Sequence, residues 1–110
     1  MHWTVAYYNE HVRQEVYSLP GGVLARYLRY VELMEKHGID LRSPHSEPMG
    51  EGLFELRPKG PEGIGRVFFC TLAGNTMVIL HSFVKKTQKT PQKEINIARQ
   101  RLREVKHGEA

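Results

Sequence analysis

The chain has 110 residues, of which 40% are hydrophobic and 25% charged, and its formal net charge is +4. These values are typical of an ordinary globular chain that forms one domain over residues 1–110. The longest apolar runs, such as MVIL at 77–80, are too short to cross a bilayer and no signal-peptide pattern is visible, so we expect no contact with membranes.

The first half of the chain predicts one strand and two helices. The β-rich stretch WTVAYY predicts a strand over 3–8, and Asn9 has the side chain of an N-cap for a helix over 10–18. Pro20-Gly21-Gly22 is expected to break that helix. Apolar residues then recur at spacings of three and four, which predicts an amphipathic helix that ends at Gly38. These residues are Val23, Leu24, Tyr27, Leu28, Val31 and Met34.

The second half predicts three strands and a last helix. Residues 40–52 are rich in Ser, Pro and Gly and are expected to form a loop. Strands are predicted over 53–57, 65–72 and 76–84, with turn sequences between them that suit antiparallel neighbours. Cys70 is expected to be a buried thiol of a cytoplasmic protein, because a single cysteine has no partner for an internal disulfide.

The last helix is expected to start with Thr90 as its cap and Pro91 in its first turn. Its apolar stripe is formed by Ile95, Ala98, Leu102 and Val105. The predicted order is β-α-α-β-β-β-α, an α+β domain with a small, mostly antiparallel sheet. The two N-terminal helices cover one face, and the other face is left for the last helix and a ligand.

The positive charge is concentrated at the C-terminal end. Residues 1–84 contain 8 Lys or Arg against 9 Asp or Glu, whereas residues 85–110 contain 8 against 3. One explanation is a solvated helix face. The other is a polyanionic partner, either nucleic acid phosphates or an acidic protein surface.

The turn between the last two strands determines which side chains share a face. If the two residues Gly74-Asn75 close the hairpin, Phe68 pairs with His81 and Arg66 pairs with Phe83. A three-residue turn at 73–75 would reverse the faces. We expect the two-residue turn. The side chains that then share one face of the last strand are Met77, Ile79, His81, Phe83 and Lys85.

This register would gather basic side chains suited to RNA cleavage. Arg66, His81 and Lys85 would lie on one face, where Arg57 could join them and where an RNA strand could bind. Cleavage requires loss of the 2′-hydroxyl proton, stabilisation of charge on the phosphate and protonation of the 5′-oxygen. The arginines could hold the phosphate, and His81 or a lysine whose pKa is lowered by neighbouring cations could move protons.

Structural roles for the same residues stay open. His81 could be a hydrogen-bonded strand residue, Arg57 and Arg66 could pair with Glu55 and Glu62, and the lysines could only keep the loop soluble. The six histidines lack the spacing of metal ligands, and no glycine-rich phosphate loop follows a strand, so neither a metal nor a cofactor is expected.

Three stretches carry a family resemblance: GLFELR at 52–57, GRVFFCTL at 65–72 and VILHSFVKKTQKTPQKEINIARQR at 78–101. They resemble toxins of bacterial type II toxin–antitoxin modules, the RelE/ParE superfamily, in its phage-derived HigB-like branch. The resemblance implies the α+β fold described above. It also implies a toxin that cleaves mRNA on the translating ribosome without a metal and is held inactive by a cognate helix-turn-helix antitoxin.

The resemblance also implies site residues and leaves alternatives. The family's basic active-site residues match Arg57, Arg66 and Lys85 with Lys86, and His81 fits the pattern of the branch. Lys89 and Lys93 are further candidates for binding RNA.

Some members carry a catalytic Tyr or His near the C-terminus, where this chain offers only His107. A DNA gyrase poison, or a non-enzymatic basic module that binds RNA or an acidic protein, are the alternative functions. The antitoxin complex could contain two chains or be a heterotetramer.

Overall fold

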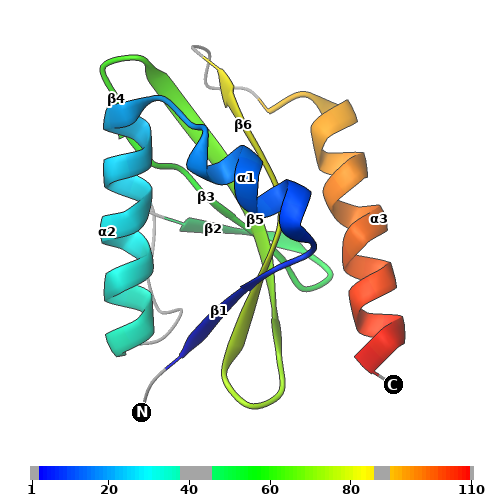
Figure 1. The fold of residues 1–110 in the computed structure, drawn as a ribbon. Coiled ribbons are helices and arrows are strands. Elements are labelled where there is room, and N and C mark those ends of the chain that lie inside the picture. The colour runs from blue at the N-terminus through cyan, green and yellow to red at the C-terminus, as the bar shows by residue number, and fades with distance from the viewer. Residues whose placement is uncertain (1–2, 38–45, 86–89, 110) are drawn as a thin grey trace.

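The computed structural model describes residues 3–37, 46–85 and 90–109 (Figure 1). The chain forms an α+β fold with three helices, as predicted, and with six strands where four were expected. In chain order the elements are β1 (Thr4–Tyr7), α1 (Glu10–Tyr17), α2 (Gly21–His37), β2 (Ser46–Gly50), β3 (Leu53–Leu56), β4 (Lys59–Gly60), β5 (Gly63–Leu72), β6 (Thr76–Lys85) and α3 (Gln92–Glu109). Within this described part of the chain, no helix has the length and apolar character that a membrane span requires.

The six strands form one sheet in the order β1-β6-β5-β3-β2, with the short β4 paired to the start of β5. The pairs are antiparallel except that β1 runs parallel to β6. β1 pairs only with residues Thr76 to Ile79 of β6. Beyond Ile79, therefore, no described strand covers the outer edge of β6.

Helices cover both faces of the sheet. Figure 1 shows α1 and α2 on one side of the strands and α3 on the other. Each side has its own core, as expected when a twisted sheet buries apolar side chains on both faces. The core under α1 and α2 includes Val12, Val16, Val23, Tyr27, Met34, Leu56, Val67, Phe69, Met77 and Ile79. The core under α3 includes Leu53, Phe68, Cys70, Val78, Leu80, Ala98 and Leu102.

Different residues mark the starts of α1 and α2. Asn9 caps α1 as predicted, because its side chain accepts a hydrogen bond from Val12 N at 2.8 Å. Pro20-Gly21-Gly22 does separate α1 from α2, but α2 already begins at Gly21. A Cβ on Gly22 would lie 2.6 Å from Pro61 Cδ, so glycine is required where α2 meets the turn after β4.

The predicted turn between β5 and β6 is wrong, although the predicted strand pairs are found. Leu72 pairs with Thr76, so three residues close the hairpin, and Asn75 adopts φ +59°. A β-bulge between the pairs Phe69–Ile79 and Phe68–His81 then restores the expected register. Because a period of two assumes an uninterrupted ladder, the sequence could not reveal this compensation.

The bulge also changes which side chains of β6 share a face, so the expected face is wrong. Met77 and Ile79 lie in the core under α1 and α2. Val78 and Leu80 lie under α3, and Phe83 packs against that same core. The five residues that were expected to share one face are therefore divided by the bulge at Leu80, and His81, Phe83 and Lys85 face α3.

The predicted loop 40–52 contains an edge strand that the composition concealed. β2 pairs with β3 through Glu47–Glu55 and Pro48–Phe54, with an irregularity after Pro48. Proline is tolerated there because the outer edge of a sheet needs no hydrogen-bond donor. Residues 38–45 of this loop, with the expected helix end at Gly38, lie outside the described residues.

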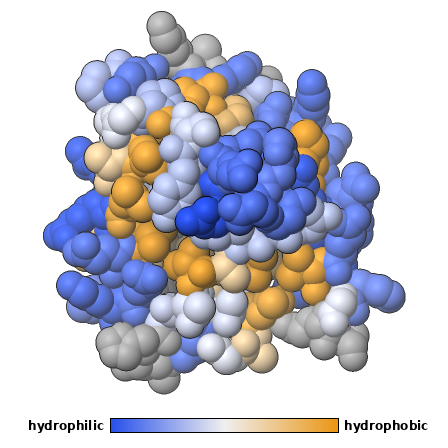
Figure 2. Space-filling model, viewed as in Figure 1, coloured by the Kyte–Doolittle hydropathy of each residue, from blue (hydrophilic) through white to orange (hydrophobic). Residues whose placement is uncertain are grey.

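Polar and apolar side chains alternate over the front of the molecule. Figure 2 shows a hydrophilic cover over the outward side of α1 with apolar surface on both sides of this helix. Tyr17 and Leu28 are the large hydrophobic residues that are exposed within the described chain.

Candidate active site on the α3 face of the sheet

One row of side chains crosses four strands on the α3 face. Glu47 pairs with Glu55, Glu55 with Phe68, and Phe68 with His81. Directly paired residues point to the same side of a sheet, so these four side chains form one line across it. Glu94 of α3 meets the end of the row, where its Oε1 lies 2.6 Å from His81 Nε2.

Arg57 extends this row at the end of β3. Its Nε donates to Glu55 Oε1 at 2.7 Å, and its Nη2 lies 3.3 Å from Glu47 Oε2. The Arg57 side chain is 28% exposed, whereas that of Glu55 is fully buried. Arg57 therefore forms the pair with Glu55 that the sequence left open, and its guanidinium still reaches the surface.

Glu55 connects the sheet to the start of α3. Its Oε2 accepts a hydrogen bond from Thr90 Oγ1 at 2.9 Å. The helix α3 begins at Gln92, one residue later than expected. Its first helical hydrogen bonds run from Glu94 N and Ile95 N to Pro91 O. A buried carboxylate is costly unless it is paired, and here two partners on different elements satisfy it.

Arg66 lies in the next row, opposite Phe83, and is fully buried. Burial lowers the pKa of Arg66, the Glu55 carboxylate opposes this shift, and the charge of Arg57 adds to it. Arginine stays protonated even so. Arg66 is therefore a fixed positive charge within the sheet face, where a surface guanidinium was expected.

His81 is held between rings and a carboxylate. Its ring stacks with Phe68 at a centroid distance of 6.3 Å and lies 6.2 Å from that of Phe83. Its side chain is 10% exposed and that of Glu94 is 21% exposed. Nδ1 of His81 is buried and has no hydrogen-bond partner among the described residues. An Nε2–H that donates to Glu94 would fix both the ring orientation and the tautomer.

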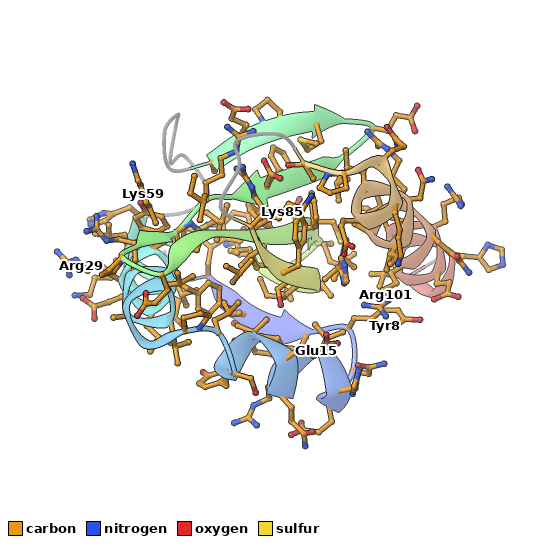
Figure 3. All side chains as sticks on the ribbon, turned by 90° about the horizontal axis from the view of Figure 1, so that it is seen from above. Tyr8, Glu15, Arg29, Lys59, Lys85 and Arg101 are labelled. Carbon is orange, nitrogen blue, oxygen red and sulfur yellow. The ribbon has the colours of Figure 1, made fainter. Side chains whose placement is uncertain are left out.

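The lysine candidates are only partly described. Lys85 is exposed at the end of β6, on the face that His81 and Phe83 share (Figure 3). Lys93 is exposed in the first turn of α3. Lys86 and Lys89 lie outside the described residues. The structure thus brings Arg57, Arg66, His81 and Lys85 onto one face, together with three carboxylates: Glu47, Glu55 and Glu94.

The positions of these three carboxylates could not be predicted equally well from the sequence. Glu55 and Arg57 are two residues apart in a strand, a spacing that places them on one side. Glu47 lies in a strand that the composition concealed. Glu94 could not be inferred, because its contact with His81 depends on how α3 packs on the sheet.

Some of the cationic side chains of α3 form hydrogen bonds that hold this helix on the sheet. Arg99 donates to Met49 O at 2.7 Å and to Gly50 O at 3.2 Å. Arg101 donates to Leu80 O at 2.8 Å, the carbonyl at the β6 bulge. These two arginines therefore bind strand carbonyls, and the charge excess overstates the number of cations that a ligand could meet.

Arg101 also joins α3 to the end of β1. Its guanidinium lies 5.0 Å from the centre of the Tyr8 ring, and Figure 3 shows the two side chains next to each other. The Tyr8 hydroxyl donates to Glu104 Oε2, and this bond raises the pKa of Tyr8. Within the described residues, no three His, Cys, Asp or Glu side chains are grouped as a metal site requires.

Comparisons with known proteins agree with this architecture. A phage-derived protein family, Gp49-like (DUF891), matches residues 14–103, a range that includes the site. Among solved structures, the archaeal RelE-RelB complex from Pyrococcus horikoshii OT3 contains a similar chain, with 19% sequence identity and a TM-score of 0.54. The match covers 81% of this chain and 100% of that chain. No curated protein sequence gives a significant match.

At this identity the structural match establishes the fold, and the family match establishes the relationship. The expected RelE-like fold and phage-derived, HigB-like branch are both confirmed. The chain therefore belongs to the phage-derived Gp49-like family and has a RelE-like fold.

Proposed function

We propose that this protein is the toxin of a toxin–antitoxin module and acts in the cytoplasm as a ribosome-dependent, metal-independent endoribonuclease that cleaves mRNA. Family membership and the RelE-like fold support this class. The observation that carries the proposal is the convergence of Arg57, Arg66 and the His81–Glu94 pair on one sheet face. The exposed Lys85 lies on the same face.

Arg57 is the residue that binds the scissile phosphate. Its bond to buried Glu55 is short, whereas its contact with Glu47, which is 39% exposed, is 3.3 Å long. A phosphate oxygen can replace Glu47 at Nη2 while Glu55 keeps the guanidinium in place. Arg66 acts beneath the surface as a fixed charge that favours the growing negative charge on the phosphate.

The His81–Glu94 pair takes the proton of the 2′-hydroxyl. Glu94 is the more exposed partner, and His81 Nδ1 is buried, so the Glu94 carboxylate accepts the proton, while the Nε2–H of His81 donates to that carboxylate and holds it in place. The 2′-oxygen then attacks phosphorus, the bond to the 5′-oxygen breaks, and a 2′,3′-cyclic phosphate forms. Lys85 with Lys86 gives the leaving 5′-oxygen its proton.

A cognate helix-turn-helix antitoxin neutralises the toxin in this proposal. The solved neighbour is a RelE chain in complex with RelB, which supports a protein partner for this fold. Co-expression with the adjacent reading frame and measurement of the complex mass would separate a two-chain complex from a heterotetramer.

The proposed activity is tested by expressing variants and following growth and mRNA cleavage. Arg57→Ala and Glu94→Gln should each reduce cleavage at least a hundredfold, since removing one positioned charge or base typically costs this much. Arg57→Ala leaves the buried Glu55 carboxylate without its cationic partner, so it is combined with Glu55→Gln, and circular dichroism checks that each variant is folded. Arg29→Ala is the matched control, because Arg29 forms an ion pair with Glu32 on the exposed side of α2. Undiminished cleavage by both site variants would contradict the proposal. Intact transcripts with damaged DNA would instead indicate a gyrase poison.

A further inference from the structure

The segment that leads into α3 contacts the candidate active site at two points. Glu94 bonds to His81, and one helical turn earlier the hydroxyl of Thr90 donates to Glu55 Oε2 at 2.9 Å. Glu55 and His81 lie on different strands, and both are paired with Phe68 of the strand between them. The start of α3 is therefore bonded to two strands of the site.

The contact of Thr90 differs from the helix cap that the sequence predicts. A capping hydroxyl accepts a hydrogen bond from a backbone N–H of the first turn. Here α3 begins only at Gln92, and the described bond of the Thr90 hydroxyl is the one that it donates to Glu55. Threonine has a single O–H donor, so this donor is used by the buried carboxylate.

The two oxygens of Glu55 have different donors. Oε1 accepts a hydrogen bond from Arg57 Nε at 2.7 Å, and Oε2 accepts the bond from Thr90. A carboxylate with both oxygens available frequently binds two N–H groups of one guanidinium as a bidentate pair. Because Thr90 occupies Oε2, Glu55 holds Arg57 through Nε. The Nη2 of Arg57 then lies 3.3 Å from Glu47 Oε2, on a carboxylate that is 39% exposed.

We propose that Thr90 is a positioning residue that keeps the Nη2 group of Arg57 available to a phosphate. Without the hydroxyl, Oε2 of fully buried Glu55 loses its donor, which is unfavourable. A second hydrogen bond from Arg57, through Nη2, would satisfy this oxygen. The resulting bidentate pair would use the N–H group that a phosphate has to reach, so phosphate would bind more weakly. The role in RNA cleavage rests on the proposed function, whereas the effect on Arg57 does not.

The test compares the full-length wild type with Thr90→Val, which keeps the shape of the side chain but lacks the hydroxyl. Nitrogen-15 NMR follows the Nε–H and Nη groups of Arg57, and inorganic phosphate is the anionic probe. Thr90→Val should shift the Arg57 Nε–H signal and slow the exchange between its two Nη groups, because a bidentate pair hinders their rotation. It should also weaken phosphate binding about tenfold, the equivalent of one charged hydrogen bond. Thr90→Ser, which retains a hydroxyl, should restore the wild-type signals and affinity.

Two controls separate positioning from a general effect on the fold. Thr4→Val makes the same chemical change at an exposed residue of β1 and should leave the Arg57 signals and phosphate binding unchanged. In Glu55→Gln the amide keeps a single acceptor oxygen, so a bidentate pair with Arg57 is impossible. Adding Thr90→Val to this variant should therefore change phosphate affinity by less than about twofold. Circular dichroism checks that each variant is folded.

Three results would overturn the positioning role. These are unchanged Arg57 signals and phosphate affinity in Thr90→Val, an equal effect of Thr90→Val in the Glu55→Gln background, and slow Nη exchange already in the wild type. The last result decides the question even if Thr90→Val does not fold.

RNA cleavage is measured separately on the same variants. Thr90→Val should reduce cleavage by the same factor of about ten as phosphate binding, and Thr90→Ser should recover it. A wild type that cleaves no RNA, but whose phosphate binding depends on Thr90, would refute the proposed function and leave the positioning role supported.

Discussion

Arg57 and His81, which reach the surface of the candidate site, are each held by a carboxylate. Glu55 is fully buried against Arg57, and Glu94 bonds to the imidazole of His81. Such pairs orient a side chain more than they stabilise the fold, because the cost of desolvating two charges offsets most of their attraction. The arrangement therefore favours positioning, which is what a phosphate-binding guanidinium and a proton-transfer pair require.

A second pair of polar groups lies in the core on the other side of the sheet. The hydroxyls of Tyr7 on β1 and Tyr27 on α2 are 2.9 Å apart. Burial raises the pKa of Tyr7 from 10.0 to about 12, and burial also raises the pKa of Tyr27. Both hydroxyls therefore favour the protonated form in the folded state.

This shift predicts loss of stability in alkaline solution. Unfolded tyrosine ionises near pH 10, so the stabilisation is complete below that pH and is lost as the pH rises through about 12. For half-buried Tyr7 the loss at pH 11 is about 1 kcal/mol after allowance for solvent screening, and Tyr27 adds to it. Urea unfolding at pH 9 and pH 11 would measure it. Tyr7→Phe should reduce the loss markedly, whereas Tyr17→Phe should reduce it only slightly, because burial raises the pKa of Tyr7 more than the contact with the Tyr17 hydroxyl does.

At the scale of elements, α3 depends on polar bonds to the sheet as well as on its apolar stripe. Ala98 and Leu102 are buried in the core beneath it. Around them, Arg99, Arg101 and Lys106 donate to backbone carbonyls of three different strands, β2, β6 and β5. The bulge at Leu80 matters here, because a bulged residue leaves the ladder and its carbonyl can accept the Arg101 bond.

Arg101→Ala should destabilise the protein by about 2 kcal/mol, because it removes a charged hydrogen bond and a cation–π contact. Hydrogen exchange in α3 should accelerate more than in α2, since the loss falls on one docked element. Arg103→Ala, at an exposed position of the same helix, should change stability by less than about 0.5 kcal/mol. An equal loss of stability in the two variants would contradict the role of Arg101 in holding α3 on the sheet.

The elements show where the sequence was informative. The apolar periodicities of α2 and α3 and the cap at Asn9 are local signals, and the structure bears them out except at Leu28, which was expected in the apolar stripe of α2 and is exposed. β2 and the bulge at Leu80 are set by pairing with distant strands, which local composition does not report. The same limit explains why the pairing of Arg57 with Glu55 could be anticipated and the contact of Glu94 with His81 could not.

At the scale of the whole molecule, the charge distribution is more balanced than the sequence implies. The candidate site contains Arg57, Arg66 and Lys85 but also Glu47, Glu55 and Glu94. Several cations of α3 are directed at backbone carbonyls. The molecule is therefore built to place a few cations accurately on one face, and it does not present a uniformly basic surface.

This balance predicts a shallow salt dependence of RNA binding. Arg57, Lys85 and Lys93 are the described cations that can meet phosphates near the site, so log K against log salt concentration should have a slope of about −2 for single-stranded RNA. With Lys86 and Lys89 added, the slope would reach at most about −3.5. Fluorescence anisotropy of a labelled RNA would measure it.

A matched pair of variants tests which cations contribute to this slope. Lys93→Gln should make the slope shallower by about 0.7, because one released counterion is lost. Arg29→Gln removes a similar charge from α2, where Arg29 is paired with Glu32, and should leave the slope unchanged. A wild-type slope near −6 would mean that all eight C-terminal cations bind phosphate. The hydrogen bonds of Arg99 and Arg101 to strand carbonyls would then have to break when RNA binds, which would contradict their role in holding α3 on the sheet.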